Sequence, residues 1–416
     1  MKYDWLIAGG GVAGICLAEI LTREGHSVAL LEKKDRLAGE TTKGFHEWIH
    51  TGSLYTLVPD RLTTLKFLLG AIDDLLEYYV DYQNMNLGPT ESGLAVNEHP
   101  GGWFNDHYIH YRYRVHRLNL PWAALIARSD DIIRKIKQHD WLRRRGGVLN
   151  DYKVNYFADY ITNLLKVVRT PDKFFEVRSP DFTTNSRLML ADMLATAVHH
   201  GLELKTGCGV VDMKYQNGCH EVVTDEGVIK ADNVALCCGK NISDFVEVDV
   251  KTSYAPMAVV DGCTSDTRSF VNLDYFTKRC INLIVKDNGI GLAGGITLNK
   301  KADCQAYLDY VVKEHQKLNP QIRTLGTYIG EKNEITFKSQ DRNYLYHIVN
   351  SGERMWSVVP GKYTLGFSLA PEFYRRMYHK NPSKGLNTIS DDGTYRAMIQ
   401  DTYWQEIAKQ HQSEKQ

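Results

Sequence analysis

The clearest pattern of hydrophobic positions lies at the start of the chain, where two apolar runs flank a glycine-rich turn and a helical segment. Residues 3–8 (YDWLIA) predict a buried strand, residues 13–22 (AGICLAEILT) a helix, and residues 27–31 (SVALL) a second strand that ends at Glu32. Short continuous apolar runs are typical of strands covered on both faces, as in a parallel sheet. The pattern therefore predicts one βαβ unit at the beginning of the chain.

The turn of this unit carries a GxGxxG pattern that suits a dinucleotide. Gly9 can make the tight turn, Gly11 lets a pyrophosphate approach the backbone, and Gly14 lets helix and strand pack closely. The phosphates would then lie at the helix N-terminus, which favours anions. Glu32 can accept the hydroxyls of an adenosine ribose, and Lys33 follows it. We favour FAD over NAD because a motif this early leaves the rest of the chain to cover the cofactor.

Composition narrows the class of protein. The chain has 416 residues, 43% of them hydrophobic, which is enough for two globular domains. Its 50 basic and 50 acidic side chains give no global field toward nucleic acid or an anionic membrane, so we expect a small-molecule substrate held locally. With no signal peptide and no long apolar run, we expect a cytoplasmic protein without an integral membrane segment. The eight cysteines have no zinc-site spacing, so we predict no metal.

An aromatic and basic stretch in the first half predicts a strand with cations on one face. In residues 108–115 (YIHYRYRV) the alternation places Arg112 and Arg114 on one face and aliphatic and aromatic side chains on the other. Such a face could bind a substrate carboxylate or phosphate, and Lys338 is a further candidate. The alternative, a solvated strand face, stays open.

A second GxGxxG pattern at residues 289–294 is interpreted as part of a hairpin. Asp287-Asn288-Gly289 is a turn sequence between two apolar runs, and no amphipathic helix follows Gly294. We therefore assign no second nucleotide site here.

The remaining patterns predict an α/β fold with two domains. We expect a Rossmann-like FAD-binding domain of the glutathione-reductase type and a second α+β substrate domain built on an antiparallel or mixed sheet. Helices are predicted within residues 60–90 and near residues 186–200, 305–317 and 364–371, and the end of the chain is expected to fray. The FAD-binding domain would comprise residues 1–60, 181–250 and 338–382, the substrate domain residues 61–180 and 251–337, and a polar, helical tail residues 383–416.

The order of these pieces resembles the D-amino-acid oxidase-like superfamily of FAD-dependent oxidoreductases. Four segments carry the resemblance, which is nearest to glycerol-3-phosphate and 2-hydroxyglutarate dehydrogenases: the opening βαβ unit, the HTGSLY of residues 50–55, the block of residues 181–239, and the PGKYTLGF of residues 360–367. The resemblance implies further cofactor contacts from Glu40, Thr41, Thr42, Val211, Cys238, Gly239, Gly361, Lys362, Tyr363 and Thr364.

The same resemblance implies the chemistry. FAD would remove a hydride from a C–H bond that bears a hydroxyl or an amine, in a small polar substrate that could be anionic. An amine or amino-acid oxidase on the same scaffold is one alternative. A flavin-dependent monooxygenase or halogenase is another, because residues 39–42 (GETT) are similar to a halogenase loop. His50 and His46 are the candidate bases, since imidazole titrates near neutral pH, although each could instead be structural. The electron acceptor, whether oxygen, quinone or a protein, stays open.

Overall fold

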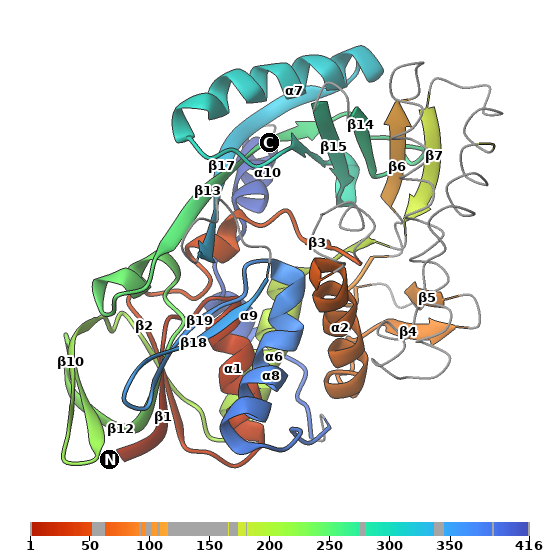
Figure 1. Cartoon of the computed structure of the whole chain (residues 1–416). Helices are drawn as coiled ribbons and strands as arrows, with labels where there is room; N and C mark the ends of the chain where they lie inside the picture. Colours follow the sequence, from red (N-terminus) through yellow and green to blue (C-terminus); the bar gives the residue numbers. More distant parts are fainter. Residues whose placement is uncertain are drawn as a thin grey trace.

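The computed structural model has two sheets that draw their strands from alternating parts of the chain (Figure 1). It describes residues 2–51, 63–90, 93–96, 101–105, 109–114, 165, 174–179, 181–274, 279–336, 345–384 and 387–414. Helices cover one face of the first sheet. The second sheet lies beyond the ends of these helices.

The first sheet has eight strands and contains the predicted βαβ unit. Its order is β10-β11-β12-β1-β2-β9, and β19 pairs with both β12 and β18. β1 is parallel to β2 and β12, β2 is parallel to β9, and β12 is parallel to β19. The strands are β1 (Lys2–Ala8), β2 (Val28–Glu32), β9 (Glu203–Thr206), β10 (Val210–Gln216), β11 (Cys219–Thr224), β12 (Gly227–Leu236), β18 (His347–Gly352) and β19 (Met355–Val359).

Both faces of the central strand are covered, which explains its unbroken apolar run. Trp5 and Ile7 of β1 pack into the cluster beneath the helices, whereas Leu6 and Ala8 pack into the cluster on the opposite face. The helices are α1 (Val12–Arg23), α2 (Thr63–Tyr78), α6 (Ser186–His199) and α8 (Gly366–Tyr378). α8 contacts both α1 and α2, so α2, which the sequence assigned to the substrate domain, packs against the FAD-side helices.

The second sheet has seven strands in the order β17-β13-β16-β15-β14-β6-β7. All neighbours are antiparallel except β14 and β6, so the sheet is mixed. α7 (Cys304–Leu318) packs on one of its faces. The strands are β6 (Ile109–Arg114), β7 (Phe174–Ser179), β13 (Val250–Asp261), β14 (Phe270–Asp274), β15 (Arg279–Val285), β16 (Gly291–Gly295) and β17 (Arg323–Ile335).

The hairpin prediction for the second GxGxxG pattern is confirmed. β15 and β16 are antiparallel neighbours, and the residues Asp287–Gly289 turn between them. Gly291 and Gly294 lie within the extended strand β16, where no helix N-terminus is available to a phosphate. The smaller elements are β3 (Trp48–Ile49) paired with β8 (Phe182–Thr183), and β4 (Leu87–Thr90) paired with β5 (Gly93–Val96).

The C-terminal tail forms helices, as predicted, but the last helix continues to Ser413, where fraying was expected. The chain ends in α9 (Thr394–Met398) and α10 (Tyr403–Ser413), and α10 begins with a capping box between Thr402 and Gln405. Ile407 and Ala408 pack against the second sheet on the face opposite α7. Apolar burial therefore fixes a helix whose sequence is mostly polar. None of the helices described is long and apolar enough to cross a membrane.

Candidate active site

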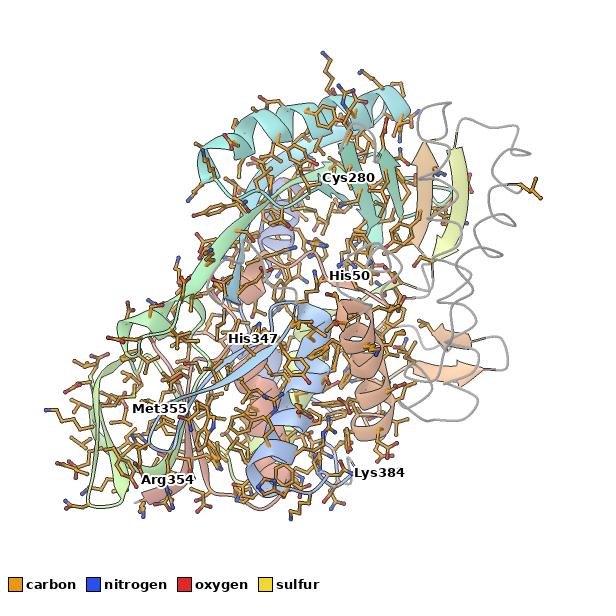
Figure 2. The ribbon with its side chains drawn as sticks, in the orientation of Figure 1. His50, Cys280, His347, Arg354, Met355 and Lys384 are labelled. Carbon is orange, nitrogen blue, oxygen red and sulfur yellow. The ribbon has the colours of Figure 1, made fainter. Side chains whose placement is uncertain are left out.

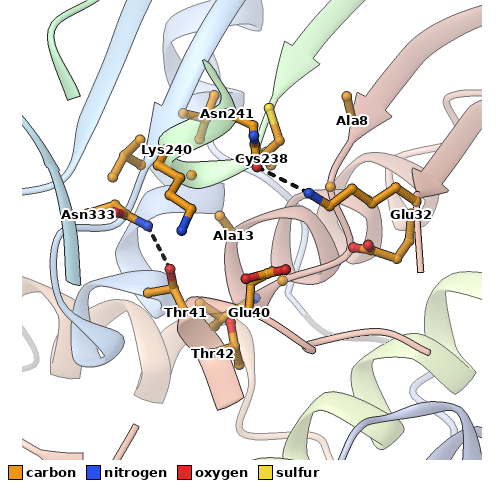
Figure 3. Close-up of a pocket in the computed structure, with 18 of the residues that line it drawn as sticks. Ala8, Ala13, Glu32, Glu40, Thr41, Thr42, Cys238, Lys240, Asn241 and Asn333 are labelled. Carbon is orange, nitrogen blue, oxygen red and sulfur yellow. Dashed lines mark hydrogen bonds between the residues drawn. The ribbon is translucent and has the colours of Figure 1, made fainter. Parts of the chain in front are cut away.

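A cavity of about 320 Å³ opens where β1, β2, β12 and β19 end (Figure 3). This is the carboxyl edge of the parallel strands, the usual ligand edge of such sheets. The predicted residues Gly9, Gly11, Glu32, Lys33, Glu40, Thr41, Thr42, Cys238, Gly239 and Gly361 line it, together with residues the sequence did not single out, among them Phe45, Lys240, Asn241, Lys332 and Asn333.

The glycine turn fits a dinucleotide because no side chain can occupy it. A Cβ on Gly14 would lie 1.9 Å from the Gly9 carbonyl oxygen, so only glycine lets α1 pack this close to β1. Gly11 is the N-cap of α1 and lines the cavity. The Val12 N–H donates to Thr42 Oγ1 at 3.1 Å, which ties the segment after Glu40 to the helix N-terminus. The turn therefore presents backbone rather than side chains to the cavity.

Glu32 is held at the end of β2 by backbone donors. Its Oε2 accepts the Gly10 N–H at 2.9 Å and its Oε1 accepts the Lys34 N–H at 3.0 Å. A carboxylate oxygen has two acceptor sites, so each oxygen keeps one for a ribose hydroxyl. Lys33 Nζ donates to Asn241 Oδ1 at 3.3 Å across the cavity mouth. The two ends of the βαβ unit thus present an anion-accepting turn and a hydroxyl-accepting carboxylate.

Of the other predicted cofactor residues, some line the cavity and some do not. Val211 does not line the cavity; a bulge in β10 leaves its side chain 61% exposed, and Cys208, Gly209 and Val210 take that place. Gly361 has φ +64°, and a Cβ there would lie 2.3 Å from the Leu345 carbonyl oxygen. The next three residues, Lys362, Tyr363 and Thr364, do not line the cavity. Thr364 Oγ1 accepts the backbone N–H of His50 at 3.0 Å.

His50 lies between the first sheet's helices and the second sheet (Figure 2), and His46 contacts the same tryptophan ring. The Trp48 ring lies between them, with its centroid 5.8 Å from that of His46 and 4.3 Å from that of His50. The His50 side chain is 14% exposed, and its Nδ1 lies 3.8 Å from Asp181 Oδ2. The two predicted candidate bases thus contact the same Trp48 ring, while Asp181 was not among the predicted site residues.

Burial keeps both imidazoles neutral. It lowers the pKa of His46 well below the ordinary value, and the charges of Lys332, His50 and other cations lower it further. Burial also lowers the pKa of His50 to about 4; Asp181 opposes this shift, while Lys362 and Lys332 reinforce it. Near neutral pH each ring is therefore a potential proton acceptor in a positive environment.

Arg112 does not join this group. Tyr111 of the same strand is fully buried and its hydroxyl donates to Asp181, so the next side chain points to the opposite face of the sheet. There the Arg112 guanidinium pairs with Glu176 at 2.9 Å and lies 5.1 Å from the Phe270 ring centre. For Arg114 the structure describes only the backbone, at the end of β6, and Lys338 lies outside the described residues.

The family model of the FAD dependent oxidoreductases (DAO) matches residues 4–325. The chain belongs to this family. As a member of the FAD dependent oxidoreductases, it uses FAD as its cofactor, and the glycine turn and Glu32 of the cleft fit that cofactor. The monooxygenase and halogenase alternatives are not supported by this match.

Solved structures with the same fold cover nearly the whole chain. Glycine oxidase from Geobacillus kaustophilus has a TM-score of 0.60 at 13% identity, covering 93% of this chain and 97% of that one. L-α-glycerophosphate oxidase from Mycoplasma pneumoniae, with FAD bound, has a TM-score of 0.63 at 15% identity, again covering 93% and 97%. At such identities the likeness shows the fold alone.

One curated relative matches a short stretch. The 4,4'-diapolycopen-4-al dehydrogenase of Metabacillus indicus is 33% identical over 87 residues, which is 20% of this chain and 16% of that protein. The chain therefore spans about a sixth of that relative's length, and the match carries no conclusion about its substrate.

Proposed function

We propose that this FAD dependent oxidoreductase oxidises the CH–OH group of a small anionic substrate, with His50 as the base. The observation that carries the proposal is a neutral, nearly buried imidazole beside Asp181, in an environment made positive by Lys332 and Lys362. Bound FAD supplies the hydride acceptor. The chain itself must take up the hydroxyl proton and hold the substrate's charge.

The protonation state of His50 suits this role. Its pKa is lowered to about 4, so the ring is unprotonated near neutral pH and can accept a proton when the C–H bond breaks. As pH falls through the pKa, the base becomes protonated and activity is lost. His46, on the same segment, is the second candidate for this role.

The positive environment favours an anionic substrate. Lys332 and Lys362 both lower the pKa of His50, which means that both ammonium groups act on the same small region. Lys332 Nζ donates to Thr297 Oγ1 at 3.4 Å, which places its ammonium group between β17 and the residues that follow β16. A carboxylate or phosphate held here would place the neighbouring carbon beside the imidazole. The position of Arg112 makes these two lysines the better anion partners.

Amine oxidation is the second candidate, because the fold is shared with a glycine oxidase as well as a glycerophosphate oxidase. An ammonium group loses its proton to water far more readily than an alcohol does, so an amine substrate has less need of a base. A positioned base such as His50 therefore favours an alcohol substrate over an amine. The electron acceptor, the cytoplasmic location and the absence of a nucleic-acid partner stay predictions.

Matched substrates separate these readings. We expect anaerobic addition of lactate to bleach the flavin absorbance where alanine does not, and glycerol 3-phosphate to bleach it where glycerol does not. The first pair tests hydroxyl against amine at constant carboxylate, and the second tests the anionic group. Bleaching by alanine alone would replace the proposal with amino-acid oxidation, and bleaching by glycerol would remove the anion requirement.

The base is tested by His50→Gln. We expect kcat to fall by about 10²–10⁴-fold with the flavin still bound, since general-base catalysis contributes that much. In the parent enzyme, kcat should fall as pH drops through about 4. His315→Gln is the matched control, because His315 is also buried with a pKa lowered to about 4 but lies in α7, behind the second sheet. If both variants lose activity equally per folded enzyme, His50 is not the base.

A further inference from the structure

Asp181, at the start of the block that leads into α6, is a fully buried carboxylate that the resemblance gives no role. Its Oδ1 accepts the Thr51 N–H at 2.8 Å and also the Thr51 hydroxyl. Its Oδ2 accepts the Trp48 indole N–H at 3.2 Å and the Tyr111 hydroxyl at 2.6 Å. Four uncharged donors from two separate parts of the chain thus fix the carboxylate in one orientation.

One oxygen of this carboxylate lies near His50, at an ion-pair distance longer than a hydrogen bond. The same Oδ2 lies 3.8 Å from His50 Nδ1, while the backbone N–H of His50 is held by Thr364 on the other side. A carboxylate beside one ring nitrogen favours the tautomer that carries its proton there and leaves the other nitrogen as the acceptor. It also favours the charged ring over the neutral one once that acceptor takes a proton.

We propose that Asp181 is the positioning residue that keeps the proton of neutral His50 on Nδ1 and leaves Nε2 free to accept the substrate's proton. This rests on the proposed function of His50 as the base. In the oxidation, the hydroxyl proton would pass to Nε2 as the C=O bond forms, and bound FAD would accept the hydrogen and electron pair of the C–H bond. Asp181 stays ionised throughout and stabilises the imidazolium, as expected for a carboxylate behind a catalytic histidine.

Several charged or titratable groups surround His50. Tyr111 approaches from β6, Lys332 from β17, Lys362 from the loop after β19, and His46 from the same segment; Asp181 is the acidic member of the set. Of these groups, the pKa of His50 is raised by Asp181 and lowered by the two lysines. Removing the negative charge must therefore lower that pKa, and strengthening it must raise that pKa.

Two variants give opposite shifts. Asp181→Asn removes the charge, so the acid limb of kcat moves to lower pH, and an amide N–H beside Nδ1 favours the unproductive tautomer. We expect kcat to fall about 100-fold or more at neutral pH, with KM changed less than threefold. Tyr111→Phe removes a donor from the carboxylate, so the limb moves to higher pH and kcat changes less. A merely structural role would not move the two limbs in opposite directions.

A measurement on the resting protein separates this proposal from the proposed reaction. Nitrogen NMR of histidine-labelled protein, with the His50 signal assigned through His50→Gln, reports the tautomer without any substrate. We expect Nδ1–H in the parent and in Tyr111→Phe, and Nε2–H in Asp181→Asn. The same tautomer in parent and Asp181→Asn would overturn the proposal even if hydroxy acids bleach the flavin. The expected change in tautomer, without bleaching by any hydroxy compound, would instead overturn the proposed function.

A double variant completes the test. Because Asp181 acts through His50, Asp181→Asn should lower kcat no further in the His50→Gln background. Multiplication of the two single losses would show that Asp181 acts independently of His50 and would overturn the proposal. If Asp181→Asn does not fold, the limb shift of Tyr111→Phe still decides, since an unchanged or lowered limb contradicts it.

Discussion

The dinucleotide cleft and the cluster of side chains around His50 (the His50 cluster) are built in different ways. The core of the cleft, from the glycine turn to Glu32, lies within one βαβ unit and uses backbone groups and one carboxylate. The His50 cluster consists of side chains from five distant segments, at His50, Tyr111, Asp181, Lys332 and Lys362. The first is therefore a local property of the sequence, whereas the second exists only when both sheets have formed.

One short segment joins the two regions. Glu47 has φ 57°, in the left-handed region, and its carboxylate accepts the Ser186 N–H at 2.9 Å, Lys286 Nζ at 2.8 Å and the Trp404 indole N–H at 3.0 Å. Nearby, Lys43 Nζ pairs with Glu406 at 2.7 Å. α6, the second sheet and α10 are thus all tied to residues 43–47, between the flavin cleft and His50.

We expect the largest loss of FAD and of stability from a substitution in the glycine turn of the βαβ unit. In Gly14→Ala the new Cβ would meet the Gly9 carbonyl oxygen at 1.9 Å, so α1 must move away from β1. We expect loss of FAD from the purified protein and a fall of about 3 kcal/mol in the free energy of unfolding. Flavin content and thermal unfolding measure this. Gly70→Ala in α2 is the control, because nothing lies within 4 Å of its Cβ; it should keep FAD and be stabilised by about 1 kcal/mol.

Glu47→Gln tests whether the contacts of Glu47 hold residues 43–47 in place. Lys286 would keep its buried charge without its partner, since the two side chains are only 3% and 2% exposed. Denaturant titration should show a loss of about 3–5 kcal/mol, and Lys286→Met in the same chain should restore part of it. Glu331→Gln breaks the exposed pair with Lys240 and should cost about 0.5 kcal/mol. Equal losses in the two single variants would mean that the Glu47 contacts do not hold the segment.

Variants of two cationic residues test which side chain binds the substrate's anionic group. With FAD saturating, Lys332→Met should raise KM for the anionic substrate about 10–100-fold, the effect of losing a hydrogen bond to a charged group. Arg112→Ala should leave KM within about twofold, because that guanidinium lies on the other face of the sheet beside Glu176. Steady-state kinetics on both variants would reverse this assignment if Arg112→Ala gave the larger change.

These differences explain what the sequence could predict. The βαβ unit, the hairpin at the second GxGxxG pattern and α7 follow from local periodicity and turn residues, and they are confirmed. His46 and His50 were singled out because imidazole titrates near neutral pH, and their catalytic role stays a prediction. Asp181 and Lys332 carry no local signal, since one opens a loop and the other lies in a polar stretch of β17. The tail was predicted to be helical, but the burial of α10 was not, because it depends on a sheet formed by residues far away in the chain.

We propose that the local cleft holds FAD and that the His50 cluster binds a hydroxyl-bearing anion beside it. The most direct measurement is the absorbance spectrum of the purified protein, reconstituted with FAD if needed, before and after anaerobic addition of lactate, glycerol 3-phosphate and alanine. The account predicts oxidised-flavin bands that bleach with a hydroxy compound and stay unchanged with alanine. A protein that neither carries nor takes up FAD, or a flavin that only alanine bleaches, would contradict it.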